Sequence, residues 1–236
     1  MRIDPFGDSA LLITFDREIS ELVNQEVISL YKRLQRIDGF QYLIPAYNSL
    51  TIGLDLKQWN FERASAAVRS EYERVPKTPK VSAKETYTIP VCYESPLEMD
   101  LDDVSRQTGL SKNEIIDLHT NQTYRVYMLG FVAGFAYMGS LPESLNCKRK
   151  ETPRLKVPKG SVGLAGLQTG IYPTEAPGGW QIIGQTPLEM FDLHRSDTSL
   201  LKPGDCVKFR AISFEEFRII RLKIETGIFE MEEADV

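Results

Sequence analysis

Glycine and proline crowd residues 158–187, and this crowding most limits how the chain can fold. Seven of the 16 glycines lie between Pro158 and Pro187. A long helix is excluded there, because glycine and proline are the poorest helix formers. The same segment carries apolar and aromatic residues that a linker would not need. It is predicted to form short strands joined by tight turns, with glycines where φ is positive or where two segments approach closely.

Polar and aromatic side chains stand between these glycines. Ser161, Gln168, Thr169 and Tyr172 supply hydroxyl and amide groups, and Trp180 supplies an apolar plane. Small-molecule pockets combine groups of these two kinds. Two interpretations stay open at this point: the glycines form the corners of a β-barrel, or the segment lines a binding site.

The first eighty residues are predicted to form a small α+β domain, a sheet with helices on one face. Its first strand is expected in "SALLITF", after a turn in "DPFGD". A helix follows that ends at Gly39, with an apolar face made of Val23, Val27, Leu30, Leu34 and Ile37. Two strands are expected within "FQYLIPAYNSLTIGL", and a second helix in "KQWNFERASAAVRSEYERV".

The stretch "PKTPKVSAKE", Pro76 to Glu85, is the most linker-like segment of the chain. It places a boundary between a domain at 1–80 and a β-barrel domain at 86–236, and we expect limited proteolysis to release a fragment beginning near Thr86. Two short helices are expected in the second domain, the second one with a capping box at Ser111 and Glu114. The apolar runs "YTIPVCY", "YRVYMLGF", "DCVKFRAIS" and "FRIIRLKIE" indicate the many short strands of a barrel.

Charge and composition exclude several classes of function. The net charge of −5 argues against nucleic acid as the main partner, because binding phosphates needs a basic face. No apolar run approaches the roughly 20 residues that span a bilayer, and the first residues do not resemble a signal peptide. Cys92, Cys147 and Cys206 are odd in number and form no CxxC pair, which favours a reduced, cytoplasmic setting.

Familiar catalytic motifs do not occur. The segment "GFAYMGS" has the spacing of a phosphate loop without its lysine, and no GxGxxG is present. No cluster of His, Cys and carboxylate residues has metal-binding spacing, so no bound metal is predicted. Of the two histidines, His119 is the better catalytic candidate because Thr120 and Tyr124 are its neighbours; a structural hydrogen-bonding role is the competing interpretation.

A basic cluster interrupts this acidic protein. It comprises Lys148, Arg149, Lys150, Arg154, Lys156 and Lys159. The cluster is either a solvated loop or a local positive field for a carboxylate or phosphate. In the second case Arg154 is the expected clamp, because a guanidinium can bind an oxyanion through two hydrogen bonds.

Several longer segments together resemble one family. They are "VYMLGFVAGFAYMGSLPESL", "TPRLKVPKGSVGLAGLQTGIYP" and "PGGWQIIGQTPLEMFD", with "GDSALLITF", "PAYNSLTI" and "IPVCY" before them. In this order they resemble the family of the 5-oxoprolinase B subunit, which is also described as allophanate hydrolase subunit 1 and as the kinase A inhibitor. The likeness covers nearly the whole chain, although Ala133 replaces a proline that the family usually has.

The resemblance implies a cyclophilin-like barrel behind a small α/β domain. It also implies one component of an enzyme that works with an obligate C subunit and with an A subunit, opening 5-oxoproline to glutamate with ATP as co-substrate, alone or with magnesium. Phosphorylation of the lactam oxygen would turn a stable amide into a good electrophile, which accounts for the need for ATP without a protein nucleophile. A member of an obligate complex is expected to expose an apolar patch that its partner covers.

The resemblance and the residue types together give a candidate site. The expected catalytic residues are His119, Arg154, Gln168, Thr169 and Tyr172, and the expected substrate-binding residues are Tyr124, Phe135, Tyr137, Ser161, Gly166 and Trp180. The family motif also includes Gly130, Phe131, Gly134, Gly139, Pro158, Gly160, Pro177, Gly178 and Gly179. We expect Gln168, Thr169 and Tyr172 to point from a rigid glycine rim into the substrate cleft.

Two other functions stay open. The family includes a regulator that blocks a sensor histidine kinase, and it includes proteins assigned to allophanate or related carboxylated ureas. All of these functions would keep the same fold.

Overall fold

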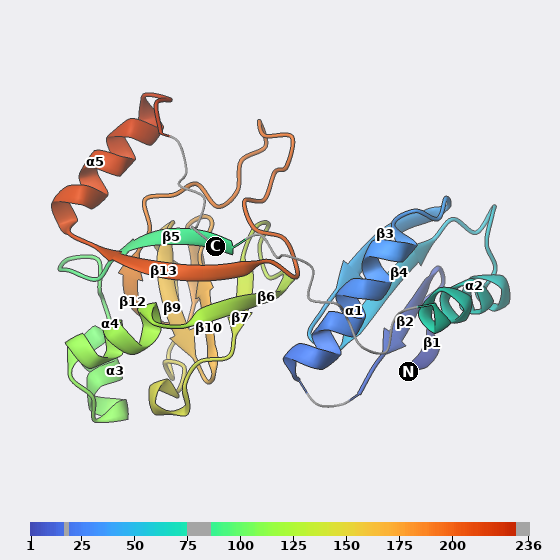
Figure 1. Cartoon of the computed structure of the whole chain (residues 1–236), viewed down its shortest axis with the longest axis horizontal. Coiled ribbons are helices and arrows are strands. Elements are labelled where there is room, and N and C mark those ends of the chain that lie inside the picture. The colour runs from blue at the N-terminus through green and yellow to red at the C-terminus, as the bar shows by residue number, and fades with distance from the viewer. Residues whose placement is uncertain (17–18, 75–85, 230–236) are drawn as a thin grey trace. The chain divides into compact units, whose positions relative to one another are not determined.

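The computed structural model describes residues 1–16, 19–74 and 86–229 (Figure 1). The chain divides into two compact units, Met1–Ala83 and Lys84–Val236. The predicted linker, Pro76 to Glu85, lies outside the described residues, and so does the proposed cleavage point before Thr86. Each unit is described by itself below.

The first unit is a four-stranded antiparallel sheet with two helices. The strands are β1 (Arg2–Phe6), β2 (Ala10–Thr14), β3 (Phe40–Pro45) and β4 (Ser49–Leu54), in the spatial order β1-β2-β4-β3. The helices are α1 (Glu21–Leu34) and α2 (Phe61–Glu73). Buried side chains of both helices, including Val27, Leu30, Ala64 and Val68, share one core with β2 and β4. The hydrophobic effect of that shared core holds the helices on the sheet.

Two predicted boundaries in this unit were wrong. The segment read as the turn "DPFGD" is mostly strand β1, because Pro5 occupies an edge strand, where a missing N–H is tolerated. The helix ends at Leu34 rather than at Gly39. Gly39 instead precedes β3 with φ of +87°, and a side chain there would collide with Trp59.

The second unit contains a closed barrel of seven strands (Figure 1). The strands are β5 (Thr86–Cys92), β6 (Thr123–Leu129), β7 (Ala136–Gly139), β9 (Ser161–Ala165), β10 (Gln168–Ile171), β12 (Gln181–Gln185) and β13 (Cys206–Ile212). Their order around the barrel is β10-β7-β6-β13-β5-β12-β9. Strands β5 and β13 run parallel, whereas the other neighbours are antiparallel. A separate pair, β8 (Arg154–Val157) and β11 (Ala176–Gly178), lies outside the closed barrel.

Three α-helices and one short 3₁₀ turn accompany the barrel: α3 (Leu101–Thr108), α4 (Lys112–Thr120), η1 (Glu143–Leu145) and α5 (Phe214–Glu225). The capping box at the start of α4 is confirmed, with the Ser111 and Glu114 side chains each bonded to the other residue's backbone N–H. Among the residues that the structure describes, no helix has both the length and the apolar character needed to cross a membrane.

The segment "FRIIRLKIE" is not a barrel strand, as its apolar character suggested, but part of α5. The hydroxyl of Ser213 accepts a hydrogen bond from Glu216 N at 3.1 Å and begins the helix. Phe217 and Ile220 then face the barrel core at helical spacing. The β-branched isoleucines favour a strand locally, and this burial outweighs that preference.

The glycine-rich segment forms β9, β10, β11 and β12 and the turns between them. Gly160 has φ of +79°, and a side chain there would collide with the carbonyl oxygen of Thr186. At Gly178 a Cβ would collide with the Tyr172 hydroxyl. Close approach of neighbouring segments therefore accounts for both glycines.

Candidate functional site

A cluster of aromatic side chains lies at one side of the barrel. It consists of Phe131, Phe135, Tyr137, Tyr172 and Trp180, and we call it the aromatic cluster. Phe135 is central, with its ring centroid 4.8 Å from that of Tyr137, 5.1 Å from Tyr172, 5.5 Å from Trp180 and 5.7 Å from Phe131. Most of these contacts are edge-to-face, which is a favoured geometry for aromatic pairs. The cluster thus joins the β6–β7 loop, β7, the end of β10 and the start of β12.

Phe131 is the exposed member of this cluster. Its surface is 56% exposed, and its φ of +67° is the only positive value at a non-glycine residue in the described chain. The loop is held by hydrogen bonds from Gly130 N to Phe135 O (3.2 Å) and from Val132 N to Gly130 O (2.8 Å). A left-handed conformation costs roughly 1–3 kcal/mol at such a residue. A large apolar ring held in solvent by a strained backbone motivates the hypothesis that this loop belongs to a binding surface.

A buried carboxylate, Asp100, organises the basic cluster next to these rings. Its side chain is only 1% exposed and accepts hydrogen bonds from both Arg154 guanidinium nitrogens, at 2.7 and 2.5 Å. The Lys150 ammonium (2.8 Å) and the Ile182 backbone N–H (2.7 Å) donate to it as well. Burial alone would raise the pKa of Asp100, but these hydrogen bonds outweigh it and lower the pKa below its ordinary value. The ion pair therefore holds the loop at 148–150, β8 and β12 together.

Arg149 differs from its basic neighbours. Its guanidinium lies 5.7 Å from the centre of the Trp180 ring, within the range of a cation–π contact. No residue that the structure describes forms an ion pair or hydrogen bond with its side chain. The positive charge of Arg149 favours the ionised hydroxyls of Tyr137 and Tyr172, although burial is the larger influence and raises both pKa values.

His119 lies in a different place, inside the barrel core. It is fully buried, with Nδ1 2.8 Å from the Tyr93 hydroxyl and Nε2 2.9 Å from Thr169 Oγ1. Its ring stacks on Phe209 at 4.4 Å. Burial lowers the pKa of His119 to about 3, so the ring is neutral at physiological pH. Tyr124 is buried beside it and donates to the His119 carbonyl oxygen at 3.0 Å.

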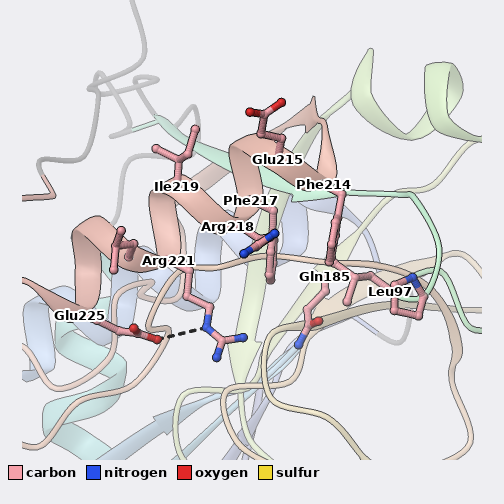
Figure 2. Close-up of a pocket in the computed structure, with 11 residues that line it drawn as sticks. Leu97, Gln185, Phe214, Glu215, Phe217, Arg218, Ile219, Arg221 and Glu225 are labelled. Atoms are coloured by element: carbon pink, nitrogen blue, oxygen red, sulfur yellow. Dashed lines mark hydrogen bonds and ion pairs between the residues drawn. The ribbon is translucent and has the colours of Figure 1, made fainter.

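A groove of about 630 Å³ runs along α5 (Figure 2). The charged side chains that line it all come from α5. Arg221 and Glu225 of that helix pair at 3.1 Å, and Figure 2 marks this contact. The aromatic cluster instead brings rings and a cation together from several elements, as ligand sites usually do. It is the stronger candidate for binding a small molecule. Over residues 1–16, 19–74 and 86–229, no group of His, Cys, Asp and Glu could hold a metal ion.

Comparison with known proteins places this fold in a family. Residues 1–201 match the family model described as "Carboxyltransferase domain, subdomain C and D". The B subunit of 5-oxoprolinase from Bacillus subtilis is 40% identical over an alignment of 228 positions, which covers 92% of this chain and 95% of that protein. The chain belongs to the carboxyltransferase-domain family (subdomains C and D) that this model describes.

Two solved structures support the assignment. A conserved uncharacterised protein from Pyrococcus horikoshii is 42% identical, with 92% of this chain and all of that chain covered and a TM-score of 0.55. The protein TTHA0988 is 33% identical over 86% of this chain, with a TM-score of 0.77, and this chain spans 40% of its length. Family members therefore occur both at this length and as part of longer chains.

Most of the predicted site residues fall into two groups. Phe135, Tyr137, Tyr172 and Trp180 come together in the aromatic cluster. His119, Thr169 and Tyr124 lie elsewhere, in the barrel core, and are buried, as Phe135, Tyr172 and Trp180 also are. The expectation that Thr169 and Tyr172 point into an open cleft was wrong, because both side chains face the interior.

The four remaining predicted residues are not members of the aromatic cluster. Ser161 is buried in β9, and Gly166 forms the β9–β10 turn with φ of +60°. Gln168 begins β10 opposite Ala165 and is half-buried. Arg154, the expected clamp, donates hydrogen bonds from its guanidinium to Asp100. It is therefore a positioning residue and not a free anion binder.

Sequence reasoning missed Asp100 entirely and gave Arg149 no separate role. Asp100 directly precedes α3, where an acidic residue is ordinary. Its partner Arg154 lies 54 residues further along the chain. The signal that pointed toward Arg149 was the basic cluster itself, which does not reveal which of its members is unpaired.

Proposed function

We propose that this chain is the B subunit of an ATP-dependent 5-oxoprolinase, which hydrolyses 5-oxo-L-proline to L-glutamate together with the A and C subunits. The observation that carries the proposal is the likeness to the B. subtilis 5-oxoprolinase protein over 92% of this chain and 95% of that protein. A likeness of this extent leaves little room for a different domain content. The aromatic cluster with its adjacent cation also suits a small ring that bears a carboxylate.

The reaction needs activation of an unreactive amide. Transfer of the terminal phosphoryl group of ATP to the lactam oxygen makes the carbonyl carbon electrophilic, and water then adds to that carbon. Collapse of the adduct breaks the ring C–N bond, the nitrogen takes up a proton, and a second water releases phosphate, which leaves glutamate and ADP. In this scheme the chain binds and orients the substrate, whereas chemistry at the phosphoryl group is shared with the partner proteins.

Reconstitution tests the proposal. The chain is mixed with the A and C subunits from the same genome, and glutamate formation from 5-oxo-L-proline is measured with and without ATP. We expect glutamate only when ATP and all three proteins are present. Allophanate is offered as a competing substrate, and inhibition of a sensor histidine kinase is measured in parallel. Turnover of allophanate alone, or kinase inhibition without glutamate formation, would replace the proposal.

A further inference from the structure

The backbone on both sides of Arg149 is fixed by hydrogen bonds. Lys148 N donates to the Gln107 side chain at 2.9 Å, and Gln181 Nε2 donates to Lys148 O at 2.9 Å. On the other side Lys150 N donates to Gly179 O at 2.7 Å, and the Lys150 ammonium is held by Asp100. Arg149 is therefore an exposed side chain on a rigid stretch of backbone.

Most of the other cations in this cluster are neutralised by carboxylates. Arg154 and Lys150 are paired with Asp100, and Lys150 also with Asp103. Two exposed pairs complete the set: Lys156 with Glu175, and Lys159 with Glu189. Lys148 is exposed and has no aromatic neighbour among the ring contacts of the described residues. Arg149 alone combines an unpaired charge with a fixed position beside the rings.

An unpaired guanidinium next to aromatic rings is suited to one class of ligand. The Arg149 guanidinium carbon lies 5.7 Å from the centre of the Trp180 ring, and its N–H groups have no partner among the described residues. Phe131, held outward on its strained loop, borders Tyr172 at a ring distance of 6.4 Å. Charge and exposed apolar surface thus both lie at the aromatic cluster, Arg149 beside Trp180 and Phe131 beside Tyr172.

We infer that Arg149 is the anion-binding residue of this site, taking the carboxylate of a small cyclic or planar amide while Phe131 covers the apolar part of that ligand. The identification of the ligand as 5-oxo-L-proline rests on the proposed function. The anion site itself rests on the geometry around Arg149. Asp100 and Arg154 act through the backbone that positions Arg149.

The test uses the assembled complex and three variants. Arg149→Gln removes the charge. Arg149→Lys keeps the charge but lacks the planar guanidinium that can form two hydrogen bonds, and Arg63→Gln is the matched control. Arg63 also lies over a tryptophan, Trp59 at 4.8 Å, but in the first unit. Each variant is assayed with 5-oxo-L-proline and with its carboxamide, which lacks the negative charge.

We expect Arg149→Gln to raise KM for 5-oxo-L-proline about 10- to 100-fold, as for loss of a hydrogen bond to a charged group, with a much smaller change in kcat. Arg149→Lys should fall between this variant and wild type, and Arg63→Gln should match wild type. The carboxamide should be equally poor for wild type and Arg149→Gln. An unchanged KM in Arg149→Gln, or a further loss with the carboxamide, would overturn the inference while leaving the proposed function in place.

A second readout separates the two proposals. The chain has two tryptophans, so Trp59→Phe leaves Trp180, beside Arg149, as the single tryptophan whose emission is followed. If the complex fails to turn over 5-oxo-L-proline, the full chain with Trp59→Phe is titrated with small carboxylates, including 5-oxo-L-proline. A saturable change in fluorescence that Arg149→Gln abolishes supports the anion site without the oxoprolinase function. If the fluorescence does not change, the anion site is overturned as well.

Discussion

Replacing Asp100 with asparagine should test whether one buried carboxylate holds the basic cluster together. The wild-type carboxylate accepts two hydrogen bonds from Arg154, one from Lys150 and one from the Ile182 backbone N–H. Asparagine keeps one acceptor oxygen and introduces an NH₂ group, which faces donors. At least one buried donor then loses its partner.

The expected cost follows from burial. Breaking a buried ion pair by removing one partner costs about 3–5 kcal/mol. Water reaches Arg154 and Lys150, whose side chains are each 23% exposed, so the lower end of that range applies. We expect Asp100→Asn to lower the free energy of unfolding by about 3 kcal/mol, which for a unit of this size lowers Tm by about 6–12 °C.

Chemical denaturation, followed by fluorescence and circular dichroism, measures this loss, with Asp103→Asn as the control. Asp103 pairs with Lys150 and Arg106 but is partly exposed, so its loss should cost about 1 kcal/mol or less. Since the pKa of Asp100 is lowered in the folded state, its stabilisation is present above about pH 4 and disappears as the pH falls further. Equal effects of the two substitutions would refute the assignment of Asp100 as the organising group.

Three further outcomes are expected. Gln168→Ala should leave folding intact and reduce ATP-coupled turnover by about ten- to a hundredfold, as for a lost hydrogen bond to substrate; normal turnover in the assembled complex would make Gln168 part of the scaffold. Thr169→Val should lower the free energy of unfolding by about 1–3 kcal/mol, because His119 Nε2 loses its partner in a dry core, and an unchanged urea midpoint would contradict this. Because the pKa of His119 falls to about 3 on folding, the stabilisation from its neutral ring should be fully present above about pH 6.5, and the free energy of unfolding should decrease as the pH drops toward 3. His119→Gln should make this pH dependence weaker in thermal melts.

Local patterns in the sequence predicted much of the second unit. The glycine-rich segment indicated short strands and turns, and the capping box at Ser111 marked the start of α4. Both signals depend on residues close together in the chain. Helix α5 was missed because its isoleucines favour a strand, whereas burial of Phe217 against the barrel, a contact that the sequence alone does not reveal, stabilises the helix.

The candidate site shows the same division. The motifs contained the residues whose rings meet in the aromatic cluster; their role in binding stays a prediction. The motifs failed to separate the roles of Arg154 and Arg149, because a pairing with Asp100 is a long-range contact formed only in the folded barrel. The same limit applies to His119, whose neighbours in sequence suggested chemistry while its neighbours in space, Tyr93 and Thr169, bury it.

The two arginines of this cluster illustrate how one carboxylate can assign different tasks to similar side chains. A buried Asp100 is tolerable only when cations surround it, and Arg154 and Lys150 meet that requirement. Their capture fixes the backbone at 148–150 and removes their charges from competition for a ligand. Arg149, one residue from Lys150, has no carboxylate partner for its guanidinium among the described residues and lies over the Trp180 ring instead. Charge near the aromatic cluster is therefore concentrated on one guanidinium, as the inferred binding of a single carboxylate requires.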